Sequence, residues 1–516
     1  MIQKKTLYSI LLIVIVGMVL MFGFSGMYPL MDPDEPVYAE TAREMIAFDD
    51  FVSPRIYGEF WYDKPPMYYW LVAGAFQLMG NSEFAARFPS GFLAIAGAVL
   101  LYLAGRKLLG ERASLLSSLI LLSSLEYFYL GNAAVTDVTL TFFLTASLLA
   151  FLHRSYYLMY ICCGLAVLTK GPVGLFFCGI IIGLHLLLSG SLKQILSMKL
   201  VRGVLLFSAV ALPWYLAMYS LHGMAFVETF LGFHNVTRFL EPEHTSGVIW
   251  YYYIPVLVVG FFPWTAFLVQ SLWRAVKEKG EAKSTCRFLF LWAMIVFVFF
   301  SISQTKLVSY ILPMYPPLAM LVGYYLDRIL AEENRGAFLR MAVGFAILAV
   351  VLIGGLVYAG MMFEGMDMAV KALTVILIAA AIGMIWLSVR RRWQEVFAVQ
   401  LSGAILFFSV LMAMAMPVLA DKFSVASFVP MVEEAYDGES TLYVEKFYRP
   451  GFAYYGDLAG KGFLKNNLST ILHEEKDKAY FVMKNKWYNQ LNDADKSKLR
   501  VLAQLEDKLF LVMEKQ

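Results

Sequence analysis

Carboxylates and lysines suited to group-transfer chemistry are concentrated between residues 31 and 66, MDPDEPVYAETAREMIAFDDFVSPRIYGEFWYDKPP. This stretch directly follows a long apolar segment and carries Asp34 and Glu35 beside Pro36. Carboxylates are costly near lipid and contribute little to the orientation of a membrane protein, so a cluster of them there indicates a functional site. We expect Asp34 and Glu35 to be catalytic; the alternative is that they only cap a helix that begins near Pro36.

The residues after Pro36 predict an amphipathic helix that lies in the membrane interface. Its apolar face would carry Val37, Thr41, Met45 and Phe48, and its polar face would carry Glu40, Arg43 and Glu44. We expect Tyr38, Glu40 and Arg43, together with Asp137 further along the chain, to contact substrate.

Several cations in predicted outward-facing loops suit a phosphate ligand. Lys64 precedes two prolines and an aromatic-rich helix within residues 61–80 that is too short to span a bilayer. Lys170 and Lys306 are each expected to open a span, where free backbone N–H groups also favour an anion. We expect a phosphate group to contact Lys64, Lys170, Lys306, Arg238 and Tyr310. The alternative for each lysine is an ordinary interface anchor.

A long loop at residues 222–247 holds three of the six histidines, His222, His234 and His244, with Glu241 and Glu243. Nitrogen and carboxylate donors of this kind suit a divalent metal ion such as Zn, Mg or Mn. The alternative is a set of solvated loop residues.

The composition predicts an α-helical polytopic membrane protein around these groups. Hydrophobic residues make up 60% and charged residues 16% of the 516 residues, against roughly 45 to 50% and about 25% in soluble domains. Thirteen spans are predicted, at residues 7–30, 89–109, 113–131, 135–152, 156–168, 171–188, 203–221, 248–273, 287–303, 307–326, 338–360, 369–389 and 395–418. The first is too long for a signal-peptide core and is expected to be retained.

Lysines and arginines fall mainly in alternate loops, which predicts a cytoplasmic N-terminus and a C-terminus outside. We expect residues 1–420 to form the membrane domain, with periplasmic interface helices at 34–80, and residues 421–516 a periplasmic α/β domain. Strands are predicted at STLYVE, KAYFVMK and KLFLVME. The net charge of +3 gives no argument for nucleic acid. The four cysteines lie in or beside apolar spans, so packing is their expected role.

The ordered motifs resemble a known family. They are DE-x-x-YAE, DKPP-x-YYW, a TDV stretch at Asp137, LTKGP, FHNVTRF with a following EH and WYYY, and TKLVSYILPMYPPLA. This set is similar to the lipid A aminoarabinose transferases and, more distantly, to the protein O-mannosyltransferases, which are GT-C glycosyltransferases. The similarity covers residues 1–420.

The resemblance implies a bacterial inner-membrane enzyme of lipopolysaccharide biosynthesis, with an undecaprenyl (polyprenyl) phosphate sugar as donor and lipid A or another envelope glycolipid as acceptor. It implies no nucleotide cofactor. By position, Asp34 would be the essential acid, Lys64 and Tyr310 would surround the lipid phosphate, and Asp63 with His244 would hold the metal. Two departures, Val37 in place of the family's usual Arg and Asp63 in place of Glu, put the sugar and the acceptor in question.

The chemistry of a lipid-phosphate donor agrees with this interpretation, because cations must gather where the charge of the leaving phosphate develops. In-line attack predicts inversion at the sugar. A hydroxyl acceptor would need Asp34 as a general base, whereas an anionic phosphate acceptor would not. Two alternatives stay open: transfer to a protein Ser or Thr hydroxyl, and a transporter or flippase for an anionic lipid.

Overall fold

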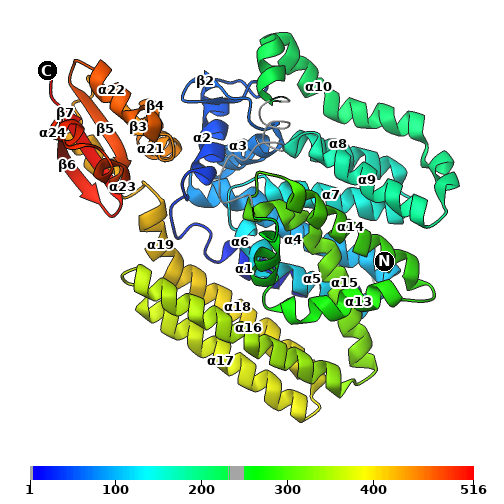
Figure 1. The fold of residues 1–516 in the computed structure, drawn as a ribbon. Helices are drawn as coiled ribbons and strands as arrows, with labels where there is room; N and C mark the ends of the chain where they lie inside the picture. The colour runs from blue at the N-terminus through cyan, green and yellow to red at the C-terminus, as the bar shows by residue number, and fades with distance from the viewer. Residues whose placement is uncertain (1–3, 231, 233–248, 516) are drawn as a thin grey trace.

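The computed structural model describes residues 4–230, 232 and 249–515. It is a bundle of apolar helices that carries a small mixed sheet at its C-terminal end (Figure 1). Within the described residues, seven helices are long and apolar enough to cross a membrane, or nine if each of two bent pairs forms one span. These features confirm the predicted helical membrane protein with a C-terminal α/β region.

The bundle is built from helices of very different lengths. In chain order its α-helices are α1 (Lys4–Phe22), α4 (Glu83–Leu108), α5 (Glu111–Leu122), α6 (Leu125–Gly131), α7 (Asp137–Leu152), α8 (Tyr156–Lys170), α9 (Val173–Leu188), α10 (Leu200–Val227), α12 (Tyr253–Gly260), α13 (Leu268–Lys277), α14 (Ala282–Ile302), α15 (Tyr315–Ala331), α16 (Arg335–Met362), α17 (Asp367–Val389), α18 (Trp393–Val410) and α19 (Met416–Phe423). Short 3₁₀ segments are η1 (Leu192–Met198), η4 (Trp264–Phe267) and η5 (Val308–Met314), and η6 (Leu411–Ala415) is a π-helical turn.

Two predicted spans are not straight helices. The span expected at 113–131 divides into α5 and α6 with a bend of 64°. The Ser124 hydroxyl at this bend donates to the Ile120 carbonyl, and such back-bonding bends helices. The span expected at 248–273 divides into α12 and residues 264–277, bent by 110°. Pro263 lies in this break. Because proline has no backbone N–H, it cannot continue the hydrogen bonding of α12.

A short layer of structure between α1 and α4 carries the acidic segment. It consists of α2 (Asp34–Ala47), the hairpin β1 (Arg55–Ile56) and β2 (Glu59–Phe60), and α3 (Met67–Met79). The short helix predicted within 61–80 is therefore confirmed as α3. The prediction that α2 presents a polar face at the membrane surface is wrong, because Glu40 and Glu44 are buried where α2 packs on protein.

The C-terminal region forms a five-stranded sheet of order β4-β3-β5-β7-β6. Its strands are β3 (Thr441–Glu445), β4 (Lys461–Phe463), β5 (Ala479–Lys484), β6 (Leu499–Leu505) and β7 (Lys508–Met513). Strand β3 is parallel to β4 and β5, and β7 is antiparallel to β5 and β6. The three predicted strands are confirmed as β3, β5 and β7, while β4 and β6 were not predicted.

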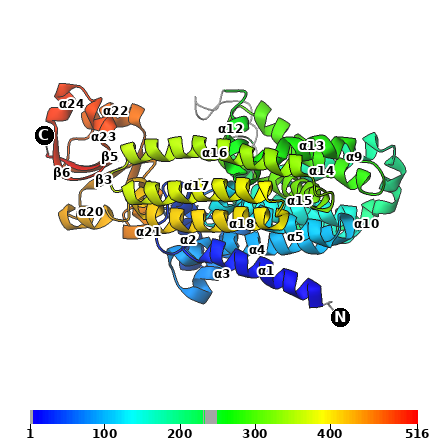
Figure 2. The ribbon, with the colours of Figure 1, turned by 90° about the horizontal axis from the view of Figure 1, so that it is seen from below.

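Helices cover both faces of this sheet. They are α20 (Val429–Ala435), α21 (Arg449–Gly456), η7 (Lys465–Asn467), α22 (Leu468–Glu474), α23 (Asn485–Asn489) and α24 (Asp493–Ser497). Alternate strand residues enter two separate cores, with Val482 and Phe510 in one and Phe481 and Leu511 in the other. Figure 2 shows this sheet and the N-terminus of α1 at opposite ends of the molecule.

Candidate active site

Asp34 is the first residue of α2, and Pro33 before it provides no side-chain cap. Its side chain is accessible to solvent, yet enough protein surrounds it that burial raises the pKa of the Asp34 carboxyl above its ordinary value of 3.8. The carboxylates of Asp137 and Asp63 raise this pKa further. An accessible carboxylate inside a dense, negatively charged surrounding is suited to proton transfer or to polarising a nucleophile.

Two lysine–carboxylate pairs lie beside Asp34. The Lys64 Nζ is 2.9 Å from Asp63 Oδ1, and the Lys170 Nζ is 2.6 Å from Asp137 Oδ1. Asp137 is the first residue of α7 and Lys170 is the last residue of α8, so each charge is at the helix end that favours it. The Lys170 ammonium also lies 4.9 Å from the centre of the Tyr310 ring.

These pairs and Asp34 form one electrostatic cluster. The charges of Asp137, Asp63 and Lys64 all act on Asp34, and Asp63 and Tyr310 act on Lys170. One turn after Asp34, the Tyr38 ring packs 5.4 Å from the Tyr68 ring and 5.8 Å from the Tyr69 ring. The structure therefore brings together seven of the predicted residues: Asp34, Tyr38, Asp63, Lys64, Asp137, Lys170 and Tyr310.

The position of Lys170 differs from its prediction. We expected Lys170 to open a span, but it closes α8, because Gly171 follows it with a φ of 80° that favours glycine and ends the helix. Lys306 does not open an α-helix either: it lies between α14 and η5, and α15 begins only at Tyr315. The Lys306 Nζ donates to the Ser303 carbonyl at 2.7 Å.

Glu35, next to Asp34, has a different environment. Arg87 donates to it from Nε at 2.8 Å and from Nη2 at 2.7 Å, and the backbone N–H groups of Met31 and Ala134 donate at 2.8 and 2.7 Å. Both carboxylate oxygens are thus occupied inside the protein. This geometry suits Glu35 to fixing the start of α2 rather than to the catalytic role expected for it.

Arg87 supports the start of α2, and sequence reasoning missed it. Besides Glu35, its guanidinium donates to the carbonyls of Ser25, Tyr28 and Pro29 and lies over the Tyr28 ring at 3.9 Å. An arginine inside the apolar helix α4 was the available signal, since buried charge in such a segment requires partners.

Glu40 and Arg43 point away from the cluster and toward the C-terminal domain. The Arg43 Nε is 2.9 Å from Glu40 Oε2, and its Nη2 donates to the Ala453 carbonyl at 2.9 Å and to Asp457 at 2.6 Å. Burial raises the pKa of Glu40 to about 7 despite its pairing with Arg43. These two residues join α2 to α21, which differs from the substrate contact expected for them.

The predicted metal site is incomplete in the part of the chain that the structure describes. His244 and Arg238 lie outside the described residues, as do His234, Glu241 and Glu243. Among the described residues no group of three His, Cys, Asp or Glu side chains could hold a metal ion. Asp63 is paired with Lys64, and the His222 Nε2 is 2.8 Å from the Ser53 hydroxyl.

Comparison with known proteins gives the family. Residues 63–216, which include Lys64, Asp137 and Lys170, match the dolichyl-phosphate-mannose-protein mannosyltransferases. The undecaprenyl phosphate-α-4-amino-4-deoxy-L-arabinose arabinosyl transferase of Aeromonas salmonicida is 30% identical over 388 residues, 71% of this chain and 70% of that protein. The chain belongs to this arabinosyl transferase family.

Two further relatives match over shorter lengths. The arabinosyl transferase of Pectobacterium carotovorum is 32% identical over 65% of this chain and 62% of that protein. An uncharacterized protein of Aquifex aeolicus is 32% identical over 61% of this chain and 64% of that protein. The matched region thus spans less than two thirds of each of these two relatives.

Solved structures confirm the GT-C fold predicted for this arabinosyl transferase family member. ArnT from Cupriavidus metallidurans superposes with a TM-score of 0.81 in the apo state and 0.80 when bound to undecaprenyl phosphate, at 23% identity over 97% of both chains. An oligosaccharyltransferase of Archaeoglobus fulgidus superposes with a TM-score of 0.57 at 12% identity, over 94% of this chain and 70% of that one.

Proposed function

We propose that this chain is an integral membrane glycosyltransferase that moves aminoarabinose or a related sugar from polyprenyl phosphate to lipid A or another envelope glycolipid. Family membership supports the reaction class, and the names of the relatives support the lipid-phosphate donor and the pentose. The observation that carries the proposal is the convergence of Asp34 with the Lys64–Asp63 and Lys170–Asp137 pairs.

The proposed reaction is a single displacement. An acceptor oxygen forms a bond to the anomeric carbon while the bond from that carbon to the donor phosphate oxygen breaks. The polyprenyl phosphate leaves with the electron pair, and the configuration of the sugar inverts. Lys64 stabilises the developing phosphate charge, since fixed cations at a leaving group are a large source of catalysis.

Asp34 has one of two roles, which depend on the acceptor. If the acceptor is a hydroxyl, Asp34 takes its proton, and the raised pKa of its carboxyl makes it a stronger base than an ordinary aspartate. If the acceptor is the phosphate of lipid A, no proton has to be removed, and Asp34 orients the acceptor or the sugar.

The charge balance suggests where the donor phosphate binds. Among the described residues of the cluster, the three carboxylates of Asp34, Asp63 and Asp137 outnumber the ammonium groups of Lys64 and Lys170. The phosphate must therefore compete with Asp63 for Lys64 or gain another cation. Arg238 and Lys306 remain the candidates that we propose for this role. A divalent metal held by Asp63 and His244 also remains a proposal.

We propose the bacterial inner membrane as the location, with the N-terminus cytoplasmic and with the cluster and the C-terminal domain periplasmic. The distribution of basic residues supports this orientation. A periplasmic site also agrees with a lipid-carried donor, because nucleotide sugars are absent outside the cytoplasm.

Transfer of radiolabelled sugar from polyprenyl phosphate to lipid A by the purified full-length protein in detergent tests the proposal. Transport across a bilayer cannot occur there, so product formation separates an enzyme from a flippase. We expect Lys64→Ala to lower kcat by about 100-fold or more and Lys64→Arg to keep part of the activity.

The matched control is Lys476→Ala, which removes an exposed lysine of the C-terminal domain. Wild-type kcat in Lys64→Ala would contradict the proposed site.

A second candidate acceptor is a protein Ser or Thr hydroxyl. The match of residues 63–216 to the protein mannosyltransferases favours it. The same assay with a Ser- and Thr-containing peptide in place of lipid A distinguishes the two acceptors, because only the true acceptor gains label.

A further inference from the structure

Helix α13 has the surface of a helix that lies in a membrane interface. Leu268, Ser271 and Ala275 are buried against the protein. At 100° per residue, Val269, Trp273 and Val276 form a different stripe, and these side chains are 79%, 64% and 63% exposed. The helix therefore has a protein-facing stripe and an exposed apolar stripe.

The polar side of α13 carries cations beside that apolar stripe. Arg274 and Lys277 project between the exposed apolar stripe and the buried one, and the Lys277 ammonium lies 3.9 Å from the centre of the Trp273 ring. Long basic side chains with an aromatic neighbour are typical of the headgroup level of a bilayer. The bend of 110° between α12 and residues 264–277 turns α13 nearly perpendicular to α12.

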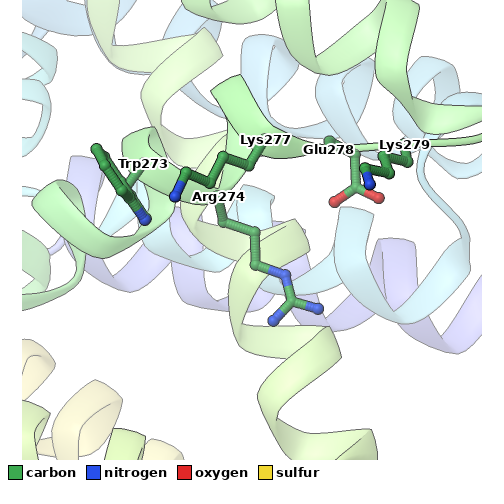
Figure 3. Close-up of a pocket in the computed structure, with 5 residues that line it drawn as sticks. All are labelled: Trp273, Arg274, Lys277, Glu278 and Lys279. Atoms are coloured by element: carbon green, nitrogen blue, oxygen red, sulfur yellow. The ribbon is translucent and has the colours of Figure 1, made fainter.

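A surface cavity of about 420 Å³ lies at the end of α13, lined by Trp273, Arg274, Lys277, Glu278 and Lys279 (Figure 3). Three cations and one carboxylate line it. Arg328 is 3.6 Å from Glu278, and Glu332 is 2.7 Å from Arg274. Among the described residues no carboxylate is within ion-pair distance of Lys277 or Lys279, so the cavity presents excess positive charge.

This cavity is at the end of the bundle opposite the Asp34 cluster. The Arg106 guanidinium at the end of α4 donates to Thr6, near the start of α1. Arg112, at the start of α5, pairs with Asp327, which adjoins Arg328 at the cavity. Asp34 follows the other end of α1, so α13 and the Asp34 cluster lie at opposite ends of the bundle.

We propose that this cavity binds the headgroup of an anionic phospholipid from the leaflet at the Lys4 end of the bundle. The positive charge of Lys277 and Lys279 attracts the headgroup phosphate, and the acyl chains contact Val269, Trp273 and Val276. Charge complementarity and the adjoining exposed apolar stripe fit a lipid better than a soluble anion, because a soluble anion gains nothing from the stripe.

The test is native mass spectrometry of the full-length protein in detergent, titrated with phosphatidylglycerol and separately with phosphatidylcholine. Each basic residue near an anionic surface changes binding by roughly fivefold, so Lys277→Gln with Lys279→Gln should weaken phosphatidylglycerol binding by roughly 25-fold. Phosphatidylcholine binding should not change. Both lysines are exposed, so the variant should unfold at the wild-type temperature.

The matched control is Arg390→Gln with Arg391→Gln, at a comparable pair where Arg390 lies over the Trp386 ring at 5.3 Å. It should bind phosphatidylglycerol as the wild type does. An equal loss in both variants would overturn the proposal in favour of diffuse charge attraction. Displacement of the lipid by free glycerol phosphate at the same concentration would also overturn it, since the cavity would then bind a soluble phosphate.

Trp273→Ala separates the apolar contribution from the charge. It should weaken phosphatidylglycerol binding severalfold while both lysines remain. Sugar transfer in detergent should stay at the wild-type rate in all of these variants, so the lipid site and the proposed reaction are tested separately. Unchanged lipid binding in Trp273→Ala would contradict the proposed acyl-chain contact.

Discussion

Asp34 and Glu35 are neighbours in the chain but have opposite physical environments. Glu35 accepts four hydrogen bonds within the protein and pairs with buried Arg87. Asp34 is accessible to solvent, yet burial by the surrounding protein raises the pKa of its carboxyl, and the carboxylates of Asp137 and Asp63 raise it further. A carboxylate paired inside the protein and a solvent-accessible one with a raised pKa are therefore adjacent at the start of α2.

Replacement of Asp34 should remove activity without loss of stability. A carboxyl whose pKa is higher in the folded than in the unfolded protein costs stability at neutral pH, and this cost disappears as the pH falls to the unfolded pKa. Asp34→Asn should therefore keep or raise Tm while sugar transfer falls by about 100-fold or more. The control is Glu59→Gln, at an exposed position of β2. A wild-type rate of sugar transfer in Asp34→Asn would refute the catalytic role proposed for Asp34.

Replacement of Glu35 should lower stability, with little effect on donor binding by the protein that remains folded. In Glu35→Gln the buried Arg87 loses its charged partner, which typically costs about 3 to 5 kcal/mol. Tm in detergent should fall markedly, and binding of the donor should weaken only as far as folded protein is lost. An unchanged Tm would show that Arg87 is held by its backbone acceptors alone.

The pH profile of transfer to a hydroxyl acceptor tests the neighbours of Asp34. Activity should be lost as the pH falls through the raised pKa of Asp34, at a higher pH than the ordinary value of 3.8 would give. Asp63→Asn removes one of the charges that raise this pKa, so the acid limb of kcat/KM should move to lower pH. An acid limb that stays in place would mean that another group controls it.

Most of the residues that gather around Asp34 were predictable from the sequence, but the partners of individual side chains were less so. Lysines and carboxylates in outward loops beside apolar spans stand out because charge near lipid is costly, and this singled out Asp34, Lys64 and Lys170. Roles depend on partners that are distant in sequence, such as Arg87 for Glu35 and Asp457 for Arg43. A local sequence pattern does not indicate such long-range pairs.

At the scale of elements, α2 is held between α3 and α21. The Arg43 side chain joins buried Glu40 on α2 to the carbonyls and Asp457 at the end of α21. Because Asp34 begins α2, contacts from the C-terminal domain help to fix the position of the catalytic candidate. The polar stripe on α2 was assigned to the membrane interface, since the sequence does not show that another domain covers it.

Arg43→Ala tests this contact. It leaves Glu40 buried without its partner, which should cost about 3 kcal/mol at pH 8. The pKa of Glu40 is about 7 with Arg43 present and should rise without it. Glu40 should therefore be protonated at pH 6, and the loss of stability should be smaller there.

Thermal unfolding of Arg43→Ala at the two pH values is the measurement. Asp457→Ala is the comparison, because Asp457 is 82% exposed and its ion pair should contribute less than about 1 kcal/mol. Equal losses of stability at pH 6 and pH 8 in Arg43→Ala would contradict the proposed dependence on Glu40.

The presence of the helices was easier to predict from the sequence than their bends. Apolar stretches of sufficient length marked the spans, but the bends of 64° and 110° depend on Ser123–Ser124 and on Pro263 in their tertiary setting. Strands β4 and β6 were missed because β4 has three residues and β6 has a mixed burial pattern, so neither shows a clear apolar alternation.

For the whole molecule, the structure separates two charged regions at opposite ends of the bundle. The Asp34 cluster and the C-terminal domain are together, while the cavity at α13 is at the end of the bundle where α1 begins. The proposed orientation puts the first region in the periplasm and the second in the cytoplasm.

Cysteine labelling in intact cells tests that orientation. The four native cysteines are free and buried, so a new exposed cysteine should dominate the signal. A membrane-impermeant maleimide should label Asp457→Cys in cells whose outer membrane is permeabilised, and should label Lys279→Cys only after lysis of the inner membrane. The reverse pattern would invert the proposed topology.

The contact between Leu30 and Tyr455 has a consequence for biosynthesis. The backbone N–H of Leu30 donates to the Tyr455 hydroxyl at 2.7 Å, across 425 positions of the chain. The segment that holds Asp34 leaves the ribosome early, yet its contacts with the C-terminal domain can form only after every helix of the bundle has been translated. A chain that ends before the C-terminal domain lacks these contacts, and we expect such a truncated product to be inactive in the bilayer.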